Sequence, residues 1–333
     1  MGADASPAKL DAERLGALQC AKLGALVRQH FGPGDREIIQ VGDLAAAIGG
    51  SNVWVLIPGD ATRRLGAVLL WASKFGDRTL HILAEDGADV VARRATSIEP
   101  APRVWTIRGT NLVATDPAPW FEGDTYASES PFAAVLAEHG IDFEVEHGVG
   151  VGRFRGLEVA RVVAEPEPHL QVGIGRFDRE AGVMLRGETS DADALANAAD
   201  EVRPHRQRGA EPHPIGRLAR ERWLRCQLLD DPSLVQCNEL WPVQPPLPEL
   251  NLLDAEPSSA IGRASDGVDV LVIAAVGVNP EIVAVAADLA VFHRPARILF
   301  AMPERDIVEP LRRSAAMLAT PSAFVPVTPE WDQ

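Results

Sequence analysis

The sequence predicts an α/β protein in which two βαβαβ units flank a central αβββα unit. Short apolar runs of strand length alternate with longer segments that have helical spacing of apolar residues. This alternation is typical of parallel sheets with crossover helices. Segments rich in turn residues and proline separate the three regions. Hydrophobic residues make up 46% and charged residues 24% of the 333 residues, which excludes a wholly disordered chain.

The first unit begins with a helix and continues as βαβαβ. Residues 8–31 carry leucines at helical spacing, and the apolar run Asn52–Ile57 predicts a strand. The strand ends at a turn, where Asp60 is expected to cap the next helix. The further predicted elements are a helix at 61–75, a strand at 78–84, a helix at 88–97 and a hairpin of strands 104–107 and 112–114.

The middle and last units follow from the same patterns. The middle unit is predicted to contain a helix at 131–139, a strand at 141–149, a tight connection at 150–156, strands at 157–164 and 170–176, and a helix at 191–202. The last unit is predicted to contain strands at 268–275, 297–302 and 323–327 and helices at 280–292 and 307–318. The expected domains are 1–125, 126–232 with a basic helix, a proline-rich linker at 233–264, and 265–333.

Charge and cysteine content exclude several classes of protein. The formal net charge of −15 disfavours nonspecific coating of nucleic acid and attachment to anionic membranes, since both need a positive field. None of the three cysteines lies in a CxxC pair, so neither a disulfide framework nor a thiolate zinc site is expected. The longest apolar runs, such as Val270–Val276, are far shorter than the ~20 residues of a membrane helix. We therefore expect a cytoplasmic protein without a membrane partner.

Carboxylates on neighbouring strands of the middle unit are the first candidate site. Glu144 and Glu146 are two apart on one strand and therefore share a face, and Glu158 lies within the next strand. Adjacent acidic side chains can hold Mg²⁺ for phosphodiester hydrolysis. We predict that all three glutamates are catalytic residues and that Glu158 and Glu146 are metal ligands. Two further acidic residues, Asp178 and Glu180, follow the third strand. The alternative is an ordinary solvent-facing side of an antiparallel sheet, which alternates in the same way.

Residues 131–202 resemble the core of the PD-(D/E)xK nucleases, the restriction-endonuclease-like fold. The resemblance depends on the αβββα order, on RGLEVARV, which contains Glu158, and on the third strand HLQVGIGRFDREA. It implies that Glu158 is the metal-binding acid of the second strand. The third strand of that family supplies an acid and a lysine, but Gln171 and Gly173 stand there, and no lysine follows Lys74. The resemblance therefore implies a degenerate core without catalytic activity.

The second candidate site is the strand–turn–helix that opens the last unit. Its turn is Gly277-Val278-Asn279-Pro280, and ligands of parallel sheets bind at such carboxyl ends of strands. Residues 268–327 resemble the Rossmann-type ligand-sensing domains associated with CRISPR systems, which bind cyclic oligonucleotides. The resemblance implies nucleotide binding at Gly277 and Asn279, whereas Glu281 would repel a phosphate. The alternative is that this Rossmann-like unit has no ligand and is purely structural. The first βαβαβ unit is Rossmann-like as well.

Two basic segments are candidates for phosphate contact. The stretch GVGVGRFRG (Gly148–Gly156) fails the GxGxxG pattern and predicts a glycine-rich hairpin, with Arg153 and Arg155 placed to touch phosphate. The segment 203–225 contains seven arginines. It is either a phosphate-contacting patch or a solvated helix whose arginines pair with the protein's own carboxylates.

These observations favour a nuclease-like protein without catalytic activity that carries a Rossmann-type nucleotide-binding unit. One alternative is an active Mg²⁺-dependent nuclease, with nucleic acid as substrate and Mg²⁺ as cofactor. The other is a structural or protein-interaction scaffold. The absence of a lysine and the presence of Gln171 favour binding over catalysis.

Overall fold

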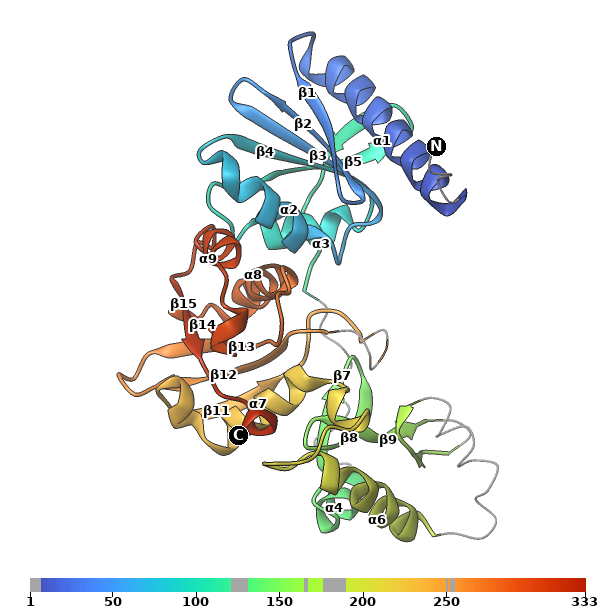
Figure 1. Cartoon of the computed structure of the whole chain (residues 1–333), viewed down its shortest axis with the longest axis vertical. Coiled ribbons are helices and arrows are strands. Elements are labelled where there is room, and N and C mark those ends of the chain that lie inside the picture. Colours follow the sequence, from blue (N-terminus) through green and yellow to red (C-terminus); the bar gives the residue numbers. More distant parts are fainter. Residues whose placement is uncertain (1–6, 121–130, 165–166, 176–189, 250, 252–254) are drawn as a thin grey trace, which may run out of the picture. The chain divides into compact units, whose positions relative to one another are not determined.

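The computed structural model describes residues 7–120, 131–164, 167–175, 190–249, 251 and 255–333. The described part is an α/β protein with three sheets, of which two are mixed and one is a four-stranded antiparallel sheet (Figure 1). The chain divides into two compact units. The first comprises Met1–Trp120, Val283–Arg294 and Glu309–Pro321, and the second comprises Phe121–Ile282, Pro295–Val308 and Ser322–Gln333.

The first unit contains a six-stranded sheet with the strand order β1-β2-β3-β4-β5-β6. Strands β3, β4 and β5 pair in parallel, whereas β1, β2 and β6 join antiparallel. The strands are β1 (Glu37–Val41), β2 (Leu44–Gly49), β3 (Asn52–Asp60), β4 (Thr79–Asp86), β5 (Arg103–Arg108) and β6 (Asn111–Ala114). The helices are α1 (Pro7–Phe31), α2 (Leu65–Ala72) and α3 (Ala88–Ala95).

One face of this sheet is covered by α1 (Figure 1). Leu23, Leu26 and Val27 of the helix pack against Trp54 and Leu56 of β3. The helix that the sequence predicts at 8–31 is therefore confirmed, and the buried apolar side chains that the structure describes lie in its second half, whereas Leu15 and Leu18 are exposed.

Two local predictions in this unit are wrong. The β1–β2 hairpin lies in residues 37–49, for which no strand is predicted. Its second strand, LAAAIG, is rich in alanine, which has little preference for strands. The Asp60 carboxylate does not cap a helix. It accepts hydrogen bonds from the backbone N–H and hydroxyl of Thr62, and this closes a turn before α2 begins at Leu65.

A buried histidine stands in the aromatic part of this core. His81 is 2% exposed, and its ring stacks between the rings of Trp54 and Trp105. Its Nε2 lies 3.0 Å from the Asn52 side chain, and its Nδ1 accepts a hydrogen bond from the Trp105 indole. Burial, together with the charge of Arg103, lowers the pKa of His81 to about 4.

This histidine makes the stability of the protein depend on pH. Because the folded pKa lies below the unfolded value of 6.5, the unfolded chain binds the proton first as the pH falls. Stability is complete above pH 6.5 and decreases toward pH 4, with a loss of about 2 kcal/mol at pH 5. Urea unfolding at pH 7.5 and pH 5 checks this. His81→Phe is expected to remove most of the difference in unfolding free energy between the two pH values, and the exposed-site control His30→Phe is expected to keep it. The same difference in all three proteins would contradict the prediction.

The second unit contains the antiparallel sheet, with the strand order β10-β9-β8-β7. One of its faces packs on two helices, with Leu136 from the first helix and Leu195 and Val202 from the second in the shared core. The strands are β7 (Asp142–Glu146), β8 (Val149–Phe154), β9 (Leu157–Val163) and β10 (His169–Val172), and the helices are α4 (Pro131–Glu138) and α6 (Asp191–Val202).

The predicted αβββα order is wrong by one strand, because residues 149–154 form β8 and not a tight connection. The chain turns instead at His147 and Gly148, both of which have positive φ. The glycines of β8, which suggest a turn in the sequence, are instead needed for close packing. A Cβ on Gly150 would lie 2.8 Å from the Phe143 ring, and one on Gly152 would lie 2.8 Å from Leu136. Glycine thus lets the core approach the strand backbone.

The second unit also contains a five-stranded sheet with the order β11-β12-β13-β14-β15. Strands β13, β14 and β15 pair in parallel and the others antiparallel. The strands are β11 (Cys237–Val243), β12 (Ser258–Ala264), β13 (Asp269–Ala274), β14 (Arg297–Met302) and β15 (Ser322–Pro326), and the helix of this unit that packs on the sheet is α7 (Arg220–Asp230). The two helices that connect the parallel strands, α8 (Glu281–His293) and α9 (Glu309–Ala315), belong to the first unit, apart from the first residues of α8. Residues 233–264, predicted as a linker, therefore contain two strands.

One face of the five-stranded sheet is covered by α7 (Figure 1). Leu224 and Leu228 of the helix pack on Val270, Val272 and Leu299 of the sheet. No helix in the described part of the chain combines the length and the apolar character that a bilayer crossing requires.

Candidate functional site

The two carboxylates of β7 point to the same side of the antiparallel sheet, as the sequence predicts. Glu144 pairs with Val151 and Glu146 with Val149 on β8. This is the side opposite the apolar core. Glu146 is 8% exposed, and the Glu144 side chain is 14% exposed, so neither lies on an ordinary solvent face. Buried carboxylates need partners, because an unpaired charge is strongly destabilising away from water.

An arginine stands between the predicted metal ligands. Arg153 of β8 is 1% exposed and is the strand partner of Glu158 on β9. Its Nη2 donates to Glu146 Oε2 at 2.8 Å, and its Nε lies 3.6 Å from Glu144 Oε2. The guanidinium thus occupies the position between β7 and β9 where the sequence predicts a cation. Arg153, predicted to contact phosphate, is too deeply buried for that contact.

A bulge in β9 sets the orientation of Glu158. The register skips Val159, so that Glu158 and Arg161 face the same side of the sheet although they are three apart. Arg161 binds Glu158 with two hydrogen bonds of 2.9 Å, from Nε to Oε1 and from Nη2 to Oε2. Glu158 is 2% exposed. This bidentate pair holds the third predicted catalytic carboxylate.

Helix α7 brings two further arginines to the same carboxylates. Arg222 and Arg225 are three residues apart and share one face of the helix. Arg222 Nη2 donates to Glu146 Oε2 at 3.0 Å, and Arg225 donates to Glu144. Glu249 joins the group at 3.4 Å from Arg222 Nη2. We call this set of six residues the arginine–glutamate network; it consists of Glu144, Glu146, Glu249, Arg153, Arg222 and Arg225.

The charges in the arginine–glutamate network balance one another. Burial alone would raise the pKa of Glu146, but the charges of Arg153 and Arg222 outweigh burial and lower it to about 2. Burial opposes the charged form of Arg222 as well, yet the Glu146 charge and hydrogen bond raise the pKa of that guanidinium. Glu146 and Arg222 are therefore kept ionised by their partners. In a charge-balanced buried cluster of this kind each carboxylate already has its counter-charge, which leaves little affinity for an added cation.

The geometry gives no support to the predicted metal site. Within the described ranges, no group of three or more histidine, cysteine, aspartate or glutamate side chains is arranged to hold a metal ion. Asp178 and Glu180 lie outside the described residues. The structure brings Glu144 and Glu146 together and places the β8 strand, with Arg153, between them and Glu158.

Arg155 lies in the tight turn between β8 and β9. Its Nη1 donates to Glu330 Oε2 at 2.7 Å, and the Trp223 indole donates to the same oxygen at 3.0 Å. The next residue, Gly156, has φ +79°, and a Cβ there would lie 2.6 Å from the backbone of Arg222. The turn is thus packed against α7 and against residues near the end of the chain. Arg155, predicted to contact phosphate, is instead paired with a carboxylate.

The arginine segment 203–225 is divided between two roles. Arg222 and Arg225 pair with the protein's own carboxylates, as the second interpretation expects, but they are buried and not solvated. Arg206 is fully buried and donates to the backbone carbonyls of Arg155 and Leu218. Three arginines of this segment, Arg206, Arg222 and Arg225, therefore lie in the interior of the protein.

The turn before α8 is held in place by internal hydrogen bonds. The Gly277 N–H donates to Asp306 Oδ2 at 2.7 Å, and the residue has φ +75°. The Asn279 side chain accepts from the Glu281 N–H at 2.9 Å and donates to the carbonyl of Ala255. A Cβ on Gly277 would meet nothing within 4 Å, so the space above its backbone is open. The nearby carboxylate makes this turn unfavourable for a phosphate.

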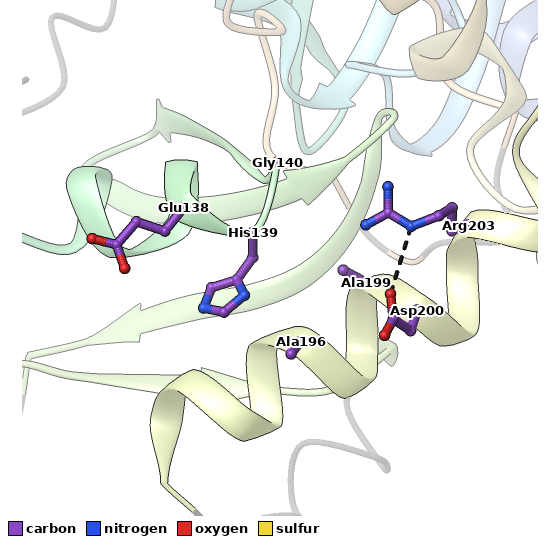
Figure 2. A pocket seen from close by; sticks show the side chains of 7 residues that line it. All are labelled: Glu138, His139, Gly140, Ala196, Ala199, Asp200 and Arg203. Atoms are coloured by element: carbon purple, nitrogen blue, oxygen red, sulfur yellow. Dashed lines mark ion pairs between the residues drawn. The ribbon is translucent and has the colours of Figure 1, made fainter.

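A pocket of about 330 Å³ lies between the end of α4 and α6 (Figure 2). Figure 2 shows the His139 ring directed toward α6 and the Glu138 carboxylate directed away from Arg203. Arg203 and Asp200 pair with each other at 3.6 Å, with side chains 55% and 75% exposed. An ion pair so exposed is screened by water and salt and contributes little. The exposed ion pair therefore cannot fix a ligand, and the one buried polar atom found among the described lining residues is the His139 Nε2, which makes no hydrogen bond.

A second pocket of about 330 Å³ lies in the first unit, at the carboxyl ends of β4 and β5. Ligands of parallel sheets bind at this edge. Its lining includes four carboxylates and one guanidinium, those of Glu85, Asp86, Asp89, Asp116 and Arg108. The excess of negative charge disfavours a phosphate-bearing ligand here.

Sequence reasoning missed Glu249 and the contact between the carboxylates and α7. The spacing of Arg222 and Arg225 on one helical face is a signal that could have indicated a shared partner. Glu249 follows a proline-rich segment and carries no such signal. Comparisons with protein-family models, with curated proteins and with solved structures found no match for this chain. What the site can do therefore follows from its own geometry and charge.

Proposed function

We propose that this protein is a non-catalytic, nuclease-like α/β protein whose C-terminal unit binds a nucleotide-like ligand. In this proposal the four-stranded unit is a restriction-endonuclease-like core without activity, and the parts of the chain before and after it are Rossmann-like. One observation carries the proposal. Arg153 hydrogen-bonds Glu146 and is the strand partner of Glu158, so a guanidinium stands where a catalytic metal would bind.

The energetics of the network support the absence of catalysis. Mg²⁺ requires several oxygen ligands and usually keeps some of its water. To bind between Glu146 and Glu158, the metal ion would have to displace the Arg153 guanidinium, and this arginine is only 1% exposed. Leaving one buried partner without its counter-charge costs about 3–5 kcal/mol. Arginine also stays protonated at neutral pH and cannot replace the lysine that the third strand lacks.

We expect no metal binding at these carboxylates. Titration of Mg²⁺ and Mn²⁺ into the full chain, followed by calorimetry, should give no heat beyond that of dilution. The same protein should leave single- and double-stranded DNA and RNA uncut in the presence of either metal. Glu158→Ala should behave like the unaltered protein in both assays.

An active Mg²⁺-dependent nuclease is the outcome that would contradict this. It would show metal-dependent cleavage, and both the heat of binding and the cleavage would be lost in Glu158→Ala. The exposed Glu239 is the matched control, because Glu239→Ala removes one carboxylate outside the network. Equal loss in both variants would indicate a general effect of charge and not a site.

The turn Gly277–Glu281 is the part that we propose as the ligand site. It follows β13 at the carboxyl end of the parallel strands, and the backbone at Gly277 borders open space. Val278 is 55% exposed and available for contact. Asp306 and Glu281 make the turn acidic, so it suits a part of the ligand that donates hydrogen bonds. A nucleobase or ribose hydroxyl fits this chemistry better than a phosphate.

A thermal-shift screen tests this ligand class. Nucleosides and cyclic nucleotides should raise the unfolding temperature, and a ligand at a hundred times its Kd stabilises by about 2.7 kcal/mol. Asn279→Ala frees the turn from Ala255 and Glu281 and should remove the shift, whereas the exposed-site control Asn238→Ala should keep it. Absence of any shift, or a shift that both variants retain, would remove this turn as the site and favour a scaffold.

A further inference from the structure

Two stretches of the chain share one order of elements. Each begins with a helix, continues with two strands and ends with a β–α–β–α–β run. The first stretch is α1–β1–β2–β3–α2–β4–α3–β5, and the second is α7–β11–β12–β13–α8–β14–α9–β15. In both sheets the spatial order of the strands follows the chain order, with three antiparallel strands followed by two that pair in parallel; the first sheet adds the antiparallel strand β6 at its edge. In both, the leading helix covers one face of its own sheet.

The first parallel pair of strands has the same register in the two sheets. Val53 of β3 pairs with Leu80 of β4, and Leu271 of β13 pairs with Ile298 of β14, with the same spacing along the chain in both cases. A glycine with positive φ stands near the end of the first parallel strand of each sheet: Gly59 is the last residue but one of β3, and Gly277 lies just after β13. The first crossover from strand to helix to strand therefore has the same length in both stretches, whereas the second crossover is two residues longer in the second stretch.

Helices from both stretches contact one another within the first compact unit. Helix α2 packs against α9. Helix α3 contacts α8 through Arg93 and Arg94, which both bind Asp288. By position in the chain, α8 is the counterpart of α2, and α9 is the counterpart of α3. Exchanging the two stretches therefore turns the first contact into the second, which is the pattern of an isologous interface.

The segments after α3 and α9 repeat this reciprocity at the level of single atoms. Ile98 and Leu318 form an antiparallel bridge, and both are buried. The Glu99 N–H donates to the Met317 carbonyl at 2.7 Å, and the Ala319 N–H donates to the Ser97 carbonyl at 2.9 Å. The residues that correspond, Ser97 with Met317, Ile98 with Leu318 and Glu99 with Ala319, have one constant spacing in the chain.

The local turns that precede this bridge also correspond. Ser97 N–H donates to the Arg94 carbonyl, and Met317 N–H donates to the Ser314 carbonyl, again at the same spacing. Mixed sheets of this order arise in unrelated proteins, so topology alone would be weak evidence. Hydrogen bonds that are exchanged when the stretches are exchanged are not expected from a chance similarity of fold.

We propose that the chain contains two copies of one α/β module, and that helices α2, α3, α8 and α9 form the interface between these copies. The partner of each module's helical surface is thus the other module of the same chain. This contact is the internal counterpart of a homodimer interface. Because each surface is already covered, the full chain does not use it to bind a second chain, and the protein is a monomer with respect to this surface.

Hydrogen exchange on the full chain tests the reciprocity. Ile98→Asp places a charge in the buried bridge and is expected to speed exchange at the Ala319 amide as well as at the Glu99 amide, by at least tenfold at each. Leu318→Asp is expected to give the same pair of changes. The control Val113→Asp, at a side chain that is 48% exposed in the same unit, should leave both amides protected. Ile98→Ala and Leu318→Ala provide milder variants if either aspartate prevents folding.

Two results would overturn the inference. One is that each substitution exposes only the amides of its own segment, because the two copies would then not share a contact. The other is that light scattering gives the unaltered chain the mass of two chains, and that Ile98→Ala or Leu318→Ala reduces it to one. The surface would then pair between chains and not within one.

Discussion

Replacing Asp288 by alanine is expected to lower the free energy of unfolding by about 3–5 kcal/mol, because it leaves two buried guanidinium groups without a counter-charge. Asp288 is fully buried on α8, and Arg93 and Arg94 are 6% and 1% exposed. Arg93 donates to Oδ1 at 2.7 Å and to Oδ2 at 3.1 Å, and Arg94 Nε donates to Oδ2 at 2.8 Å. Each arginine keeps one carbonyl acceptor, on Pro119 and Thr62, but a carbonyl does not neutralise the charge.

Urea unfolding followed by tryptophan fluorescence measures this loss. Asp288→Asn keeps the shape of the side chain and is expected to lose less than Asp288→Ala, since its carbonyl still accepts one hydrogen bond. The matched control is Asp43→Ala in the same unit, where Asp43 pairs with Arg64 at 2.8 Å but the side chains are 53% and 48% exposed. An exposed pair is worth at most about 1 kcal/mol. Equal losses of unfolding free energy in Asp288→Ala and Asp43→Ala would show that burial of the charges does not determine how much the ion pair contributes to stability.

The parallel parts of the fold could be predicted from the sequence because their signals are local. The run VLVIAA and the proline before α8 predict a strand at 268–275 and a helix at 280–292, and the structure has β13 at Asp269–Ala274 and α8 at Glu281–His293. Strand β8 could not be predicted in this way. Its glycines carry a turn signal, whereas their actual reason is the close approach of Phe143 and Leu136, which depends on tertiary packing.

The candidate site shows the same division between local and distant causes. The two-residue period of a strand correctly places Glu144 and Glu146 on one face. The bulge at Val159, which turns Glu158 toward Arg161, has no sequence signal in a single chain. The approach of α7 depends on the packing of Leu224 and Leu228 on another sheet. The sequence therefore indicates which carboxylates share one face of the sheet, but it does not indicate that arginines neutralise them.

Glu146→Gln is expected to lower the stability of the protein at pH 7 by about 3–5 kcal/mol, because Arg153 and Arg222 both lose their charged partner. The pKa gives an independent figure of similar size. A change from the ordinary value of 4.5 to about 2 corresponds to about 3 kcal/mol. The folded pKa is the lower one, so this stability is present above pH 4.5 and is lost as the pH falls toward 2.

Urea midpoints between pH 7 and pH 3 separate this effect from a general loss of packing. The unaltered protein should become markedly less stable below pH 4.5, and Glu146→Gln should show a smaller decrease over the same range, because its amide does not titrate. Glu239→Gln, at an exposed carboxyl group outside the network, should follow the unaltered protein at every pH. A Glu146→Gln profile parallel to that of the unaltered protein would mean that Arg153 and Arg222 do not hold this carboxylate ionised. In that event, the strongest argument against a metal between Glu146 and Glu158 would also be lost, since it depends on the same ion pairs.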